Sequence, residues 1–246
     1  ASPLGDQAAR AAWDALGKEQ RYAVNRVFVN VGKALEAYQR LLVPGPAPVD
    51  AYVAARRAGD LQGGRHLSPS AVRGLNLFIG KAKCVLCHSG PLFTDHSFHN
   101  IGLPSSLALP ACKGETCGPE SGRTHGAREV LASPMRCGTK HSDATTCRRL
   151  RHLNPTFDDF IGAFKTPSLR QVAETAPYMH SGEFGSLDDV LAFYNELPGT
   201  VTMGHRELFL TPLRFKPSEL ADLKAFLGTL SGAGPPVALR RPLEPK

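Results

Sequence analysis

The sequence lacks any apolar run that approaches the roughly 20 residues of a membrane-spanning helix, although 42% of its 246 residues are hydrophobic. We therefore expect no membrane span. It also lacks the second Cys-x-x-Cys pair that a zinc ribbon requires. The net charge is +7, but the basic residues are scattered and not interleaved with aromatic residues, so no nucleic-acid partner is expected. This charge serves either general solubility or attraction to an acidic partner.

No strand pattern and no internal repeat stands out, and the spacing of apolar residues predicts a mainly α fold. One long helix, or two in series, is expected over residues 8–42, where an apolar stripe recurs every three or four positions: Val24, Val27, Phe28, Val31, Leu35, Tyr38 and Leu42. Prolines end this segment at Pro44, Pro46 and Pro48, and a polar linker is expected up to residue 62.

Three further helices have recognisable starts. Ser68 as N-cap with Pro69 at the first helical position predicts a helix that runs through Phe78. An acid three residues after Ser186 predicts a second helix, and residues 216–219 begin the last one, which Gly232 can close. Residues 104–155 are rich in Gly, Pro, Ser and Thr and look irregular, yet they are too long for a bare loop.

The segment Cys84-Val85-Leu86-Cys87-His88 carries the clearest chemical signal. Cys-x-x-Cys-His is the attachment site of a c-type haem: both thiols add to vinyl groups, and His88 reaches the iron. One covalent haem c is therefore expected. A redox Cys-x-x-Cys pair and half of a zinc site are the alternatives. Haem c is attached outside the bacterial cytoplasm, so a periplasmic or extracellular location follows. The start at Ala1 fits a mature exported chain or a fragment.

Four more cysteines lie in the irregular region: Cys112, Cys117, Cys137 and Cys147. They allow three pairings, of which the short loops favour Cys112–Cys117 and Cys137–Cys147; metal binding is the alternative. The predicted architecture is a class I cytochrome c-like haem domain with long loops and a disulfide-stapled insertion at about 104–155. Residues 1–62 form a lead-in helical segment and linker, 63–235 the haem domain, and 236–246 a C-terminal tail.

The sixth ligand of the iron would decide the function, because a strong ligand makes an electron-transfer haem and an open position permits peroxide chemistry. The downstream candidates are Met179, His180, Tyr194 and Met203. Composition alone does not rank them, since a Met usually packs in a core and a Tyr usually buries its ring.

Four separated motifs follow one another in the order of a known family: residues 90–95 (GPLFTD), 98–104 (FHNIGLP), 164–170 (FKTPSLR) and 175–182 (TAPYMHSG). From about Val24 to Ser231 the chain resembles the C-terminal haem domain of the bacterial dihaem cytochrome c peroxidase and MauG superfamily. Cys137–Cys147 and residues 204–208 (GHREL) further resemble the MbnH-like subgroup. That resemblance implies a copper-binding protein as redox partner or substrate.

The resemblance implies roles for particular residues. The family's distal ligand lies fourteen residues after the histidine that matches His180, which places it at Tyr194; Met203 is the runner-up. A tyrosinate favours ferric and higher-valent iron. His180 matches the pocket histidine, and Arg170 could pair with a haem propionate or be a surface arginine. Calcium would bind the backbone carbonyls of Thr175 and Pro177, although the family's further Asn ligand lies in the first haem domain, which no part of this sequence matches.

Superfamily members carry two haem motifs, whereas this sequence has one. The resemblance therefore implies one half of a MauG-like oxidoreductase. Hydrogen peroxide would react at a second haem domain or chain, and this half would relay or store oxidising equivalents for a protein or small donor, with Tyr194 and His180 as the catalytic residues. A stand-alone single-haem electron-transfer cytochrome and a monohaem peroxidase are the alternatives. The single tryptophan, Trp13, is expected to pack.

Overall fold

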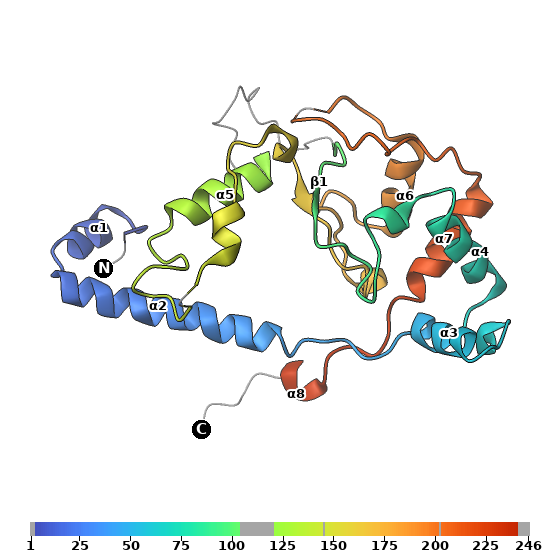
Figure 1. Ribbon diagram of the computed structural model, residues 1–246, viewed down its shortest axis with the longest axis horizontal. Coiled ribbons are helices and arrows are strands. Elements are labelled where there is room, and N and C mark those ends of the chain that lie inside the picture. Colours follow the sequence, from blue (N-terminus) through green and yellow to red (C-terminus); the bar gives the residue numbers. More distant parts are fainter. Residues whose placement is uncertain (1–2, 104–120, 145, 202, 241–246) are drawn as a thin grey trace. The chain divides into compact units, whose positions relative to one another are not determined.

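The computed structural model describes residues 3–103, 121–144, 146–201 and 203–240, and these are mainly helical, as predicted (Figure 1). The helices are α1 (Gln7–Asp14), α2 (Lys18–Gln39), α3 (Pro48–Arg57), α4 (Pro69–Ile79), α5 (Arg123–Ala132), α6 (Leu187–Glu196), α7 (Pro217–Gly228) and α8 (Val237–Arg240). Strands β1 (Phe98–His99) and β2 (Phe164–Lys165) pair antiparallel, with Phe98 opposite Lys165. None of the helices in these ranges is both long and apolar enough to cross a membrane.

The chain folds into two compact units, which we call the lead-in unit (residues 1–42 and 129–153) and the motif unit (residues 43–128 and 154–246). This division does not follow the predicted boundary at residue 62. Val49 is buried in the core of the motif unit, and residues 43–62 belong to the same compact unit as the Cys-x-x-Cys-His motif. The stretch described as a polar linker also contains α3, a helix that the sequence analysis missed.

In the lead-in unit, the predicted helical segment is two helices in series. The Asp6 carboxylate accepts from the Ala9 amide at 2.8 Å and caps α1. Arg21 of α2 donates to the Asp14 and Leu16 carbonyls and so closes the turn between the helices. The apolar stripe of α2 stays exposed, since α2 contains no buried residue.

Part of the predicted insertion folds against α2. Cys137 and Cys147 form a disulfide, as predicted, while Cys112 and Cys117 lie outside the described residues. The buried His141 ring stacks on Tyr22 at 5.0 Å between centroids, and Lys33 pairs with the Asp143 carboxylate at 2.6 Å. The irregular region also contains helix α5, which its composition had hidden.

The core of the motif unit lies where α4 crosses α7. Phe78 of α4 packs against Phe226 of α7, and both side chains are buried. Gly74 permits this close approach, because a Cβ there would lie 1.9 Å from the Asp222 carbonyl oxygen. Beside it, Arg73 makes a two-pronged ion pair with the Asp222 carboxylate. Their hydrogen bonds hold the pKa of Asp222 below its usual value.

The helix starts of the motif unit match their predictions. The Ser68 hydroxyl accepts from the Ala71 amide at the start of α4, and Ser186 and Asp189 form the capping box of α6. The helix predicted to be the last, α7, ends at Gly228, before Gly232, and the short α8 follows it. Gly232 instead lies against the Pro46 backbone, where a Cβ would come within 2.2 Å of the carbonyl oxygen. The short β1–β2 pair was not expected from the sequence.

Candidate functional site

The motif unit contains a mainly apolar cavity of ≈ 430 Å³, within the roughly 300–1,000 Å³ typical of cofactor sites. Helices α4, α6 and α7 and both strands contribute residues to its wall. Nearly every residue singled out in the sequence lines it: Cys84, Cys87, His88, Thr175, Pro177, Met179, His180, Tyr194 and Met203. The fold thus brings together residues that are up to 119 positions apart (203 − 84) around one space.

His88 is oriented for a metal. Its Nδ1 lies 2.9 Å from the Phe93 carbonyl oxygen, and a carbonyl can only accept, so Nδ1 carries the proton. The lone pair is then on Nε2, the atom that would bind iron. Burial lowers the pKa of His88, although backbone hydrogen bonds and the Asp95 charge oppose this effect. The imidazole is therefore held in the neutral form that coordinates metals.

Cys84 and Cys87 are unpaired thiols that line the same cavity. They lie on one tight turn, closed by a hydrogen bond of 2.8 Å from the His88 amide to the Cys84 carbonyl. Burial raises the pKa of Cys84 to about 12 and that of Cys87 to about 11. Both side chains therefore remain thiols, the form that adds across a haem vinyl group. Two thiols, an oriented histidine and an apolar cavity fit a covalently attached haem.

Tyr194 of α6 lines the cavity, with its ring 5.2 Å from that of Phe193. Burial is the main cause that raises the pKa of the Tyr194 hydroxyl above its usual value, and the nearby Cys84 and Cys87 raise it further. Without a cation the phenol is thus neutral. A metal ion at the oxygen would favour the phenolate, because a bound cation reverses the effect of burial. Tyr194 is suited to ligate only when iron is present.

The other candidates are placed differently. His180 stacks on Phe164 of β2, with the ring centroids 3.6 Å apart. The backbone of Met203 is anchored, since the side-chain Nδ2 of Asn100 donates to its carbonyl at 2.7 Å. Arg170 is not among the described residues that line the cavity. Its guanidinium instead makes a two-pronged ion pair with Asp50 of α3, at 2.7 Å for each contact. Arg170 thereby ties α3 to the rest of the motif unit.

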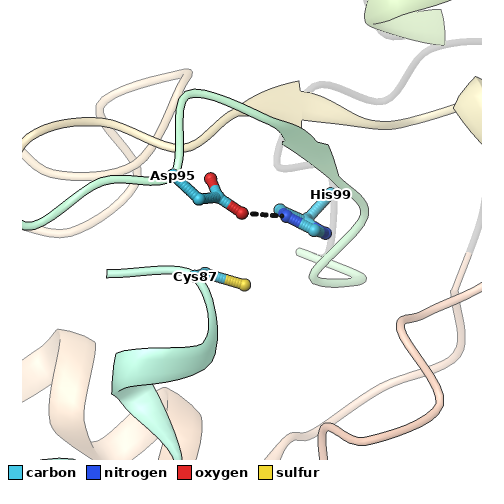
Figure 2. Close-up of side chains that lie close together, drawn as sticks. All are labelled: Cys87, Asp95 and His99. Carbon is cyan, nitrogen blue, oxygen red and sulfur yellow. Dashed lines mark hydrogen bonds and ion pairs between the residues drawn. The ribbon is translucent and has the colours of Figure 1, made fainter. Parts of the chain in front are cut away.

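The structure adds polar residues that the sequence analysis did not single out. His99 of β1 lies between two carboxylates, with Nε2 2.9 Å from Asp95 and Nδ1 2.7 Å from Glu207. Figure 2 shows Asp95 and His99 joined, with the Cys87 thiol beside them. The only local signal was an acid four residues before a histidine. The partner Glu207 is 108 residues away, too far to be recognised from spacing.

No family model matches the chain, but several proteins are similar to it. The cytochrome-c peroxidase IdrP1 of Denitromonas iodatirespirans is 37% identical over 204 residues, which are 82% of this chain and 50% of the relative. The methylamine utilization protein MauG of Methylorubrum extorquens is 32% identical over 232 residues, covering 94% of the chain and 51% of MauG. The chain belongs to the dihaem cytochrome c peroxidase and MauG superfamily.

A solved structure of this superfamily agrees with the resemblance. A MauG-like protein associated with microbial copper homeostasis superposes with a TM-score of 0.50 at 26% identity, over 76% of this chain and 52% of that one. The chain spans about half the length of the curated superfamily members that it matches.

Proposed function

We propose that this chain is the C-terminal, haem c-carrying half of a MauG-like dihaem oxidoreductase. The observation that carries the proposal is the convergence of Cys84, Cys87, His88 and Tyr194 on one apolar cavity. The similarity to half the length of MauG and IdrP1 supports it. When bound, a haem would supply one-electron redox chemistry at its iron.

Each residue has a separate task in this proposal. Cys84 and Cys87 tether the haem by thioether bonds, and His88 binds the iron through Nε2 while the Phe93 carbonyl holds its ring. Tyr194, which lines the same cavity, would be a second protein ligand to the iron and so leave it no free position for peroxide. An anionic oxygen ligand stabilises the oxidised metal. This half therefore relays or stores oxidising equivalents, and peroxide reacts at a haem of a second domain or chain.

Four further assignments follow from the same proposal. His180, stacked on Phe164, is the pocket histidine that shapes the space around the haem. The carbonyls of Thr175 and Pro177 offer oxygen ligands to calcium, a cation that prefers them, with a partner domain completing the site. The final donor is a protein or small molecule, and the similarity to a MauG-like protein of copper homeostasis favours a copper-binding protein. The protein acts in the periplasm or outside the cell.

The absorption and EPR spectra of the ferric holoprotein, before and after peroxide, test this function. We expect a low-spin spectrum that peroxide leaves unchanged, because His88 and Tyr194 would both ligate the iron. Tyr194→Phe should convert the spectrum to high spin, and the control Met203→Leu should leave it unchanged. A high-spin wild-type protein that reacts with peroxide would instead identify a monohaem peroxidase. A spectrum sensitive to Met203→Leu, and not to Tyr194→Phe, would identify Met203 as the ligand.

A further inference from the structure

The segment at residues 203–207, which carries the Gly-His-Arg-Glu motif, has no task in the function proposed above. It is nevertheless fastened to residues 100–102 by several polar contacts. The Asn100 side-chain Nδ2 donates to the Met203 carbonyl at 2.7 Å, and the Glu207 backbone amide donates to the Asn100 carbonyl at 2.9 Å. Arg206 Nε donates to the Ile101 carbonyl at 3.1 Å. These contacts hold the 203–207 segment against residues 100–102, which line the cavity together with Met203.

Charged side chains also join these two segments, through the ion pair between His99 and Glu207. Both nitrogens of His99 face a carboxylate, Asp95 on one side and Glu207 on the other. A neutral imidazole has one N–H, so only the imidazolium donates to both. Burial by itself would lower the pKa of His99, but the hydrogen bonds to Asp95 and Glu207 outweigh it and raise that pKa. The cluster thus carries one positive and two negative charges.

This cluster is also fastened to the turn that would hold the haem. The Asp95 amide donates to the Cys87 carbonyl at 2.8 Å. The candidate ligand atoms of Cys87, Asp95 and His99 all lie within 4.8 Å of one another (Figure 2). His99 itself lines the cavity, with its ring 6.5 Å from that of Phe209. A charge on His99 would therefore act at the edge where Cys87 tethers the haem.

We propose that His99 is a positioning residue: clamped between Asp95 and Glu207, it locks segment 203–207 onto residues 100–102 and sets the electrostatic field at the Cys87 edge of the haem. This inference rests on the proposed haem function. Asp95, His99 and Cys87 could also be taken for a metal site. The two carboxylates on His99 argue against that interpretation, because both of its nitrogens already donate and neither has a lone pair to offer.

The charges of Asp95, His99 and Glu207 lead to a prediction that a purely structural role of these residues would not. His99→Gln removes a positive charge and leaves two carboxylates near the haem, which stabilises ferric iron and lowers the reduction potential. Glu207→Gln removes a negative charge and raises that potential. If the residues mattered only for packing, both variants would loosen the same junction and shift the potential in the same direction.

The test is a redox titration of holoproteins, after covalent haem has been confirmed by the pyridine haemochrome spectrum. We expect the reduction potential of His99→Gln to lie below that of the wild type and the potential of Glu207→Gln to lie above it. The variant His96→Gln, at an exposed neighbouring position, should have the wild-type potential. Asp95→Asn is a second carboxylate variant, also expected to rise, should His99→Gln fail to take up haem. Potentials that stay at the wild-type value, a His99→Gln potential that shifts in the same direction as those of the carboxylate variants, or carboxylate variants whose potential falls, would overturn the inference alone. A wild-type chain without covalent haem would overturn the proposed function as well.

Discussion

The two compact units differ in how far they bury similar apolar side chains. In the lead-in unit Phe28 of α2 is 66% exposed, whereas Phe226 of α7 in the motif unit is 0% exposed. Both lie on helices with a regular apolar spacing. The pattern that predicts a helix therefore does not say whether its apolar face is buried, because burial depends on what the fold places against it.

The largest expected effect is a difference in stability loss between one Phe→Ala substitution in each unit. Phe226→Ala should lower the free energy of unfolding by about 3–5 kcal/mol, because it opens a cavity between α4 and α7. Phe28→Ala should change it by about 0.5 kcal/mol or less, since its ring is largely in solvent. Urea unfolding of both variants checks this. Equal losses would mean that the α2 stripe is buried in solution.

Glycines provide a second, smaller contrast. Gly74→Ala should cost about 1–3 kcal/mol, because the new methyl group meets the Asp222 carbonyl at the helix crossing. Gly32→Ala in α2 should stabilise by about 0.5–1 kcal/mol, since nothing lies within 4 Å of the added Cβ. Thermal unfolding of both variants, measured beside the wild type, shows whether each substitution lowers or raises the stability. A stabilising Gly74→Ala would refute the close crossing of α4 and α7.

The smallest effect concerns pH and only the motif unit. The raised pKa of His99 means that its stabilisation is complete below its ordinary value of 6.5 and is lost as pH rises through the folded pKa. The lowered pKa of Asp95, which its hydrogen bond from His99 maintains against burial, gives a contribution present above 3.8 and lost as pH falls through the folded pKa.

The two contributions overlap between these values. The stability difference between wild type and His99→Gln should therefore be greatest in mildly acidic solution and shrink on either side, as urea unfolding across pH would measure. A difference that does not vary with pH would show that His99 is not charged in the fold. His96→Gln is the matched control, with no such maximum expected.

Local signals were enough for much of the molecule. Ser68 and Ser186 were recognised as helix caps, because a cap needs only its own side chain and an amide three residues on. The Cys84–Cys87–His88 turn is equally local. Helix α3 was missed because three prolines suggested a linker, although Pro48 stands at the first turn, where proline is tolerated.

By itself, then, the sequence determined the helical class, the helix starts and a haem-type motif, all of which depend on neighbours within a few residues. Only the tertiary structure decided that Arg170 would bind Asp50, 120 residues away, and that His99 would meet Glu207. It also decided that α4 and α7 would cross at Gly74. The physical reason is that such pairings depend on where the chain returns in space, and no local spacing carries that information.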